Sequence, residues 1–112
     1  MTKYQRIQTS HFKRSLKDFL DTTSPENKKH FVRFQEIFDI DPLDNCIGTH
    51  DIYKDAKKKV VIYSSLITMK IRLIRLLKGN VIILLYKVMT DHDYNKIQKL
   101  FPMMVRLADM IE

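Results

Sequence analysis

The 112-residue sequence contains very little cysteine and very little glycine. Cys46 is the only cysteine, so no disulfide can form within one chain, and we expect a reducing, cytoplasmic environment. Gly48 and Gly79 are the only glycines, too few for the glycine-rich loops that cradle phosphate groups. Gly-x-Ser-x-Gly and Cys-x-x-Cys motifs are also missing. The sequence therefore carries no signature of a nucleotide-binding loop, a serine hydrolase or a dithiol redox protein.

Long apolar stretches are absent as well. Residues 1–17 contain no apolar core of signal-peptide length. The most apolar region, Val60–Met89, is interrupted by Lys70, Arg72, Arg75, Lys78 and Lys87. That pattern does not fit a buried transmembrane span of about 20 residues. We therefore expect a soluble protein that is not secreted by this route, and the absence of repeats and linkers predicts a single domain over residues 1–112.

Positive charge is the strongest feature of the composition. Lys and Arg number 20 against 13 Asp and Glu, which gives a formal net charge of +7. A surplus of this size favours a polyanionic partner, such as nucleic acid, an anionic membrane surface or an acidic protein. Many small soluble proteins are simply basic, so the charge alone leaves these alternatives open.

Three strand-like segments form the centre of the sequence. Val60–Ser65, Ile71–Leu77 and Val81–Met89 are rich in the β-branched, aromatic and leucine residues that suit a half-buried sheet. Gly79-Asn80 separates the last two, and both residues tolerate the positive φ of a tight hairpin turn. We predict a three-stranded antiparallel meander, with Tyr4–Gln8 as a short edge strand.

Amphipathic helices are predicted on both sides of this meander. Ser10 is a suitable N-cap for a first helix, and Ser24 followed by Pro25 is a typical start for a second. The apolar positions of the two helices recur with helical spacing: Phe12, Leu16, Phe19, Leu20, Phe31, Phe34, Ile37 and Phe38. A similar pattern follows Tyr94, where Pro102 predicts either a kink or the start of another helix.

The predicted fold class is α+β: an N-terminal helical hairpin packed on a twisted, mainly antiparallel four-stranded sheet, with a C-terminal helix. We expect the hairpin to cover one sheet face and the opposite face to be concave, basic and open. The segment Thr49–Tyr53 is interpreted as either a further short strand or extended chain. The C-terminal helix either packs on the sheet or projects to bind a partner, and packing is the favoured interpretation.

Strand alternation singles out two arginines in the middle strand. Met69, Ile71 and Leu73 share one face, whereas Lys70 and Arg72 share the other. Continued alternation puts Arg75 on the apolar face, so we expect either a bulge at that point or an exposed strand end. Arg72 lies opposite the predicted core, where an arginine is either part of a solvated sheet face or a site residue.

His92 is the best candidate for proton transfer. Asp91 and Asp93 flank it, Tyr94 follows, and histidine is the side chain that changes charge nearest neutral pH. A capping or surface role is the alternative. The remaining histidines are scattered along the chain, so the sequence predicts neither a metal site nor a cofactor.

The order of these parts resembles the RelE/ParE superfamily, the toxins of bacterial type II toxin–antitoxin modules. The residues that carry the resemblance are Phe12 and Leu16, Asp41-Pro42, Ile62-Tyr63-Ser64, Ile71-Arg72-Leu73-Ile74, and Val81–Val88 followed by Asp91-His92-Asp93-Tyr94. The resemblance covers residues 4–94. It implies a cognate antitoxin as partner and, for most members, endonucleolytic cleavage of mRNA on the ribosome; ParE-like members instead inhibit DNA gyrase.

The resemblance also implies a set of site residues. Arg72 corresponds to the central strand arginine that faces the scissile phosphate, and His92 and Tyr94 correspond to the C-terminal His and Tyr of the nuclease members. The implied RNA-binding residues are Lys57, Lys58, Lys59, Lys70 and Arg75. Many relatives carry charged residues in the strand before the arginine, where this chain has Val60, Val61, Ser64, Ser65 and Leu66. The general base is therefore unassigned, with His92 as the candidate.

The leading hypothesis is a metal-independent mRNA endoribonuclease that acts as a toxin. Attack of the RNA 2′-hydroxyl on the adjacent phosphate needs a cation, a proton-transfer group and an aromatic platform, roles that suit Arg72, His92 and Tyr94 in that order. The alternatives are a ParE-like, non-catalytic inhibitor of gyrase and a basic RNA-binding module without activity.

Overall fold

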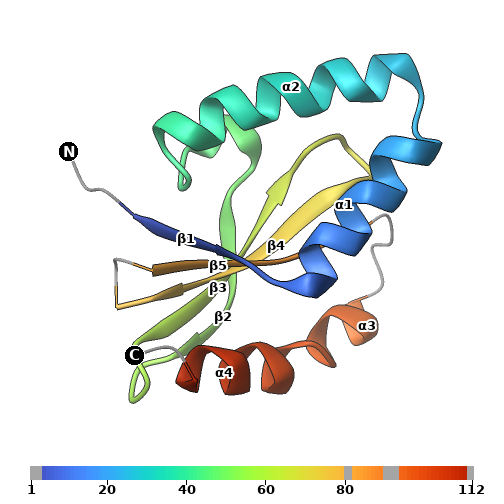
Figure 1. Cartoon of the computed structure of the whole chain (residues 1–112). Helices are drawn as coiled ribbons and strands as arrows, with labels where there is room; N and C mark the ends of the chain where they lie inside the picture. The colour runs from blue at the N-terminus through green and yellow to red at the C-terminus, as the bar shows by residue number, and fades with distance from the viewer. Residues whose placement is uncertain (1–3, 80–81, 90–93, 111–112) are drawn as a thin grey trace.

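The computed structural model describes residues 4–79, 82–89 and 94–110. Its centre is a five-stranded sheet with helices on both sides (Figure 1). The strands are β1 (Gln5–Gln8), β2 (His50–Asp55), β3 (Val60–Leu66), β4 (Arg72–Lys78) and β5 (Ile82–Met89). The class is thus α+β, as predicted.

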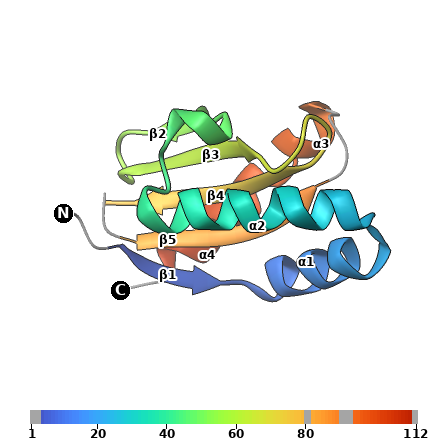
Figure 2. The same cartoon turned by 90° about the horizontal axis from the view of Figure 1, so that it is seen from above.

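The spatial order of the strands is β1-β5-β4-β3-β2 (Figure 2). The strands from β2 to β5 pair antiparallel in sequence order, which confirms the predicted meander. β1 runs parallel to β5, so the sheet is mixed. The prediction of four strands was wrong by one, because the extended segment His50–Asp55 pairs along β3 as the second edge strand.

The N-terminal helical hairpin covers one sheet face. It consists of α1 (Ser10–Thr22) and α2 (Pro25–Ile40), and Ser24 caps α2 as predicted by accepting a hydrogen bond from the Asn27 N–H. Thr9, rather than Ser10, caps α1. Its hydroxyl accepts a hydrogen bond from Phe12 N and also donates one to the Leu85 carbonyl of β5. The contact with the sheet therefore favours Thr9 over Ser10 as the N-cap residue. The core on this side contains Phe12, Phe19, Phe34, Phe38, Leu73, Leu77, Ile83, Leu85 and Val88.

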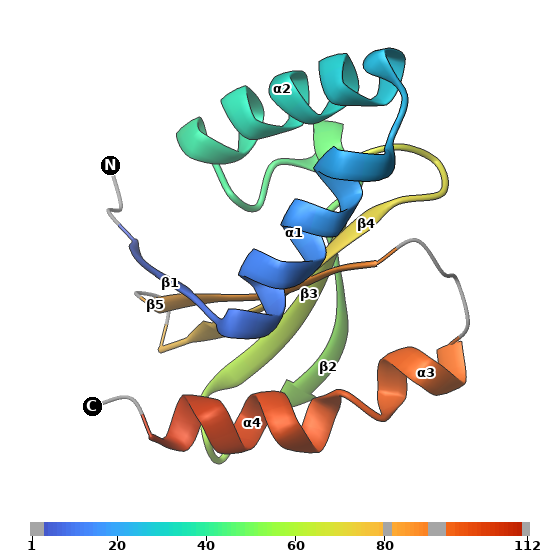
Figure 3. The same ribbon diagram turned by 45° about the vertical axis from the view of Figure 1, so that its right-hand side comes forward.

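The opposite face is not open, so that prediction was wrong. Two further helices, α3 (Tyr94–Gln98) and α4 (Phe101–Asp109), cover it, and Figure 3 shows both lying beneath the sheet. Their buried residues join those of the sheet in a second core: Val60, Ile62, Ile74, Leu76, Tyr86, Met89, Ile97, Phe101, Met104, Val105 and Ala108. Pro102 lies in the first turn of α4, so it starts a second helix and does not kink one.

The helices are short and pack against the sheet. Across the described ranges, none is both long enough and apolar enough to span a membrane. Between α2 and β2 the chain forms a short 3-10 helix, η1 (Asn45–Ile47), and Gly48 follows in the left-handed conformation with φ 63°. A side chain at Gly48 would also crowd Leu66, since an added Cβ would lie 3.0 Å from its Cδ1, so glycine is needed here for two reasons.

Candidate functional site

The two arginines of β4 lie on opposite faces of the sheet. Leu73 and Leu77 belong to the core under the helical hairpin, whereas Ile74 and Leu76 belong to the core under α3 and α4. Alternation is therefore unbroken along β4 and directs Arg75 to the hairpin side. The β-bulge expected near Arg75 is present, but the extra residue belongs to the neighbouring strand β5 and not to β4.

The bulge is in β5. Ile74 pairs with Lys87 and Arg75 pairs with Leu85, so Tyr86 is the extra residue. Helix α1 binds the end of β5 after the bulge, because the Ser15 hydroxyl accepts a hydrogen bond of 3.0 Å from Val88 N. The bulge lets Leu85 and Val88 both face the hairpin core although they are three residues apart.

Arg75 is a buried structural residue. Only 1% of it is exposed, which removes it from the predicted RNA-binding surface. Its guanidinium donates to Ser65 Oγ at 2.6 Å, to Thr49 Oγ1 at 3.4 Å and to the Pro42 carbonyl oxygen. Burial lowers the pKa of Arg75 to about 10, which leaves it protonated at neutral pH.

Two aromatic rings complete this environment. The guanidinium carbon lies 5.1 Å from the centroid of Phe38 and 5.7 Å from that of Tyr63. Cation–π attraction and three polar acceptors thus replace the solvation that burial removes. Arg75 ties the end of α2 and the loop after it to the sheet.

Arg72 is the first residue of β4 and lies on the other face. It is half-buried and pairs with Leu66 of β3 on one side and Met89 of β5 on the other. His92 follows Met89 by three residues in the sequence but lies outside the described part of the chain. Tyr94 begins α3, and its side chain also lies outside that part. The proximity of Arg72 to these two residues therefore stays a prediction.

The predicted basic rim is split between the two ends of the sheet. Lys70 is exposed in the turn before β4, close in sequence to Arg72. Lys57, Lys58 and Lys59 lie in the turn between β2 and β3, at the other end of β3. The seven residues of β3 separate the two ends by about 20 Å. Lys57, Lys58 and Lys59 therefore lie away from Arg72, and only Lys70 of the predicted rim is close to it.

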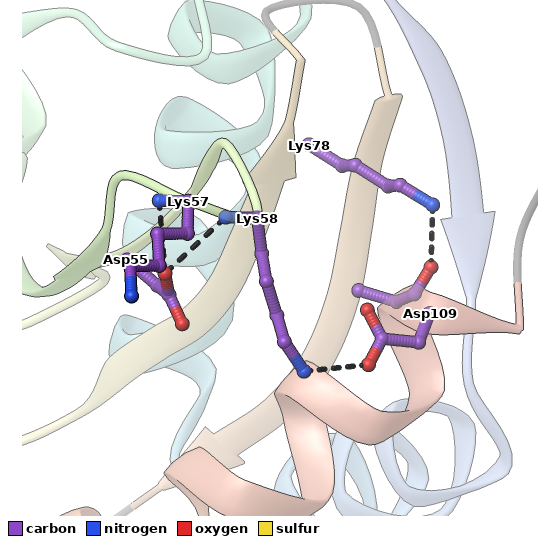
Figure 4. Close-up of polar contacts among 6 residues, drawn as sticks. Asp55, Lys57, Lys58, Lys78 and Asp109 are labelled. Carbon is purple, nitrogen blue, oxygen red and sulfur yellow. Dashed lines mark hydrogen bonds and ion pairs between the residues drawn. The ribbon is translucent and has the colours of Figure 1, made fainter.

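Two lysines at that far end hold α4 (Figure 4). Lys58 Nζ pairs with Asp109 Oδ2 at 2.8 Å, and Lys78 Nζ donates to the Ala108 carbonyl at 2.7 Å. Asp55 fixes the turn, because its carboxylate accepts from the backbone N–H groups of Lys57 and Lys58. The ion pair raises the pKa of Lys58, chiefly through the hydrogen bond to Asp109. Cations at a helix C-terminus complement its dipole.

His50 is a residue near Arg72 that the sequence analysis did not single out. It is exposed at the start of β2 and pairs with Ser64, which is fully buried in β3. The sequence offered no signal, because His50 approaches Arg72 only through the register of three strands. Among the described residues, no cluster of His, Cys, Asp and Glu could hold a metal ion.

The comparisons with known proteins give a likeness of fold. No protein-family model and no curated protein sequence matches the chain. The crystal structure of the archaeal RelE–RelB complex from Pyrococcus horikoshii OT3 matches with a TM-score of 0.60 at 14% identity, covering 83% of this chain and 99% of that one. The E. coli DinJ–YafQ complex and E. coli YafQ match with TM-scores of 0.56 and 0.54, each at 15% identity, covering 79% of this chain and 93% of theirs. The chain therefore has the fold of the RelE-like toxins.

Proposed function

We propose that this protein is the toxin of a bacterial type II toxin–antitoxin module and cleaves mRNA at the ribosome. The observation that carries the proposal is the place of Arg72: a cation at the end of a central strand, paired with the strand that leads to His92. The RelE-like fold supports it, and the net charge of +7 suits an RNA substrate.

The reaction needs no metal in this proposal. The 2′-hydroxyl of the RNA attacks the adjacent phosphorus, and the bond to the 5′-oxygen breaks. Arg72 would stabilise the extra negative charge of the phosphorane, because a preorganised cation acts most strongly where charge develops. His92 would transfer a proton, and Tyr94 would stack on a base.

The proposed partner is a small antitoxin with an acidic segment. Two of the matching structures are complexes of two proteins, RelE with RelB and YafQ with DinJ. The surplus of positive charge on this chain would steer an acidic partner, so association should slow markedly as salt rises.

Induction in bacteria tests the proposal against its alternatives. A nuclease of this kind stops translation and leaves cut mRNA, whereas a gyrase inhibitor changes DNA supercoiling first. With purified protein, ribosomes and mRNA, cleavage should persist in EDTA. Intact mRNA together with altered supercoiling would favour the gyrase inhibitor, and RNA binding without cleavage or toxicity would favour a binding module.

A further inference from the structure

The side chains of β2 and β3 show which face His50 occupies. Tyr53 pairs with Ile62, and its ring lies 5.0 Å from that of Phe101, so this pair faces α4. Two residues further along β3, Ser64 faces the same side, because Ser65 on the opposite side binds Arg75. A register shift between Asp51 and Tyr53 keeps His50 opposite Ser64. His50 therefore lies on the α3–α4 side.

Arg72 lies on the same side at the same end of the sheet. Ser64 pairs with Ile74 of β4, and Leu66 pairs with Arg72. His50 and Arg72 are thus two strands apart, about 10 Å, and offset by two residues, about 7 Å along the strands. Both side chains are long enough for their polar ends to approach one phosphodiester group from two sides.

The ring of His50 is oriented for proton transfer. Its Nδ1 lies 3.1 Å from the carbonyl oxygen of Gly48, which can only accept a hydrogen bond, so Nδ1 carries the proton. In the neutral ring Nε2 then has the free lone pair that a base requires.

A buried polar group lies between the two residues. Ser64 is 0% exposed, and within the described part of the chain its hydroxyl has no hydrogen-bond partner. Buried hydroxyls normally have a partner, so one without a protein partner needs an explanation, and a catalytic role is one. His50, Ser64 and Arg72 therefore place an oriented imidazole, a buried hydroxyl and a cation on one side of the sheet.

We propose that His50 is the general base of the RNA cleavage reaction, an inference that rests on the proposed function. Nε2 takes the proton of the 2′-hydroxyl as the 2′-oxygen forms its bond to phosphorus. The bond from phosphorus to the 5′-oxygen then breaks, and the leaving oxygen takes a proton from water, which regains one from the protonated His50. The products are a 2′,3′-cyclic phosphate and a 5′-hydroxyl end. Hydrolysis is not required, so no co-reactant is needed.

The test compares two exposed histidines in the full-length protein. His50→Gln should lower the cleavage rate on mRNA-programmed ribosomes by about 100–10,000-fold, the range for loss of a general base. His30→Gln is the matched control on α2, on the other side of the sheet, and should cleave like the wild type. Thermal melting of both variants checks the fold. Binding to an RNA with a 2′-deoxy group at the cleavage site should be unchanged within about threefold.

Chemical rescue separates proton transfer from a structural role. His50→Ala removes the ring, and added imidazole should restore a measurable part of the cleavage activity of this variant. Imidazole should restore no activity to Arg72→Ala. The pH–rate profile of His50→Gln should also lack the acidic limb that a histidine base would give the wild type. No rescue by imidazole, together with an acidic limb that His50→Gln retains, would give His50 a structural role and overturn the proposal.

The outcomes distinguish the two levels of inference. If the wild type cleaves RNA and His50→Gln cleaves equally well, the role of His50 is wrong while the proposed function stands. If the wild type cuts no RNA on ribosomes or free, both proposals are wrong.

Discussion

Arg72 and Arg75 are three residues apart in one strand, yet their surroundings differ completely. Arg75 is enclosed by Phe38, Tyr63 and three oxygen acceptors under the helical hairpin. Arg72 lies half-buried at the strand end on the opposite face. The comparison teaches that a charged residue in an apolar strand can serve packing or chemistry, and only its partners tell which.

The largest expected effect is on stability, at Arg75. Arg75→Ala removes a buried side chain and leaves the Pro42 carbonyl and Ser65 hydroxyl without their donor. We expect a loss of about 3–5 kcal/mol in the free energy of unfolding, the range for breaking a buried charged network. Urea denaturation measures it. A change below about 1 kcal/mol would show that Arg75 does not tie the loop to the sheet.

The next effect is on activity, at Arg72. Arg72→Ala should lower the rate of RNA cleavage by about 100–1000-fold, because it removes the cation that stabilises the phosphorane. Its free energy of unfolding should fall by less than about 1 kcal/mol, because the residue is the first of β4 and is only half-buried. Cleavage assays and denaturation of the same preparation check both. Full toxicity of this variant in cells would place Arg72 among ordinary surface residues.

Exchanging arginine for lysine sharpens the contrast. Arg75→Lys keeps the charge but loses the planar fork that reaches several acceptors, so we expect a loss of about 1–3 kcal/mol in unfolding free energy. At Arg72 the same exchange should hardly change stability, and it should retain more cleavage than Arg72→Ala. Equal destabilisation at both positions would contradict the distinction between them.

The smallest effect concerns Lys58, a third kind of cation. Its pKa is raised in the folded protein by Asp109, so the pair stabilises the fold below the ordinary lysine pKa and loses this contribution as pH rises through the raised value. In the Asp109→Asn variant, the free energy of unfolding should therefore fall slightly less between pH 8 and high pH than it does in the wild type. Unfolding curves of both proteins over this range measure it. Identical pH dependence would mean that solvent and ions screen the pair fully.

Much of the fold follows from local pattern. The strand-rich meander and the cap at Ser24 were predicted because they depend on residues close in sequence. At Pro102 a kink and a new helix were both left open, and the structure shows a new helix. The fifth strand was left open, since His50–Asp55 is a short edge strand with mostly exposed residues and little apolar alternation. Packing of the C-terminal helix on the sheet was the favoured interpretation and is confirmed. The second face was nevertheless expected to be open, because an amphipathic helix does not indicate which surface it packs against.

The candidate site was less predictable for the same reason. Strand alternation alone correctly places Arg72 and Arg75 on opposite faces. For Arg75, a basic residue on the apolar face, it suggested a bulge or an exposed strand end and not burial. Burial became possible only because Phe38, Pro42 and Thr49, distant in sequence, supply rings and acceptors there. Lys57, Lys58 and Lys59 looked like part of one basic surface, and the sheet length separates them from Arg72.

The amino-acid sequence by itself determined most of the secondary structure, the amphipathic faces and the surplus of positive charge, because these depend on side-chain chemistry and short-range spacing. The tertiary structure alone decided which charges are structural. Register pairs His50 with Ser64, burial assigns Arg75 to the core, and helix packing engages Lys58 and Lys78 with α4. Such contacts join residues far apart in the chain, and they form only when the whole hydrophobic core has assembled.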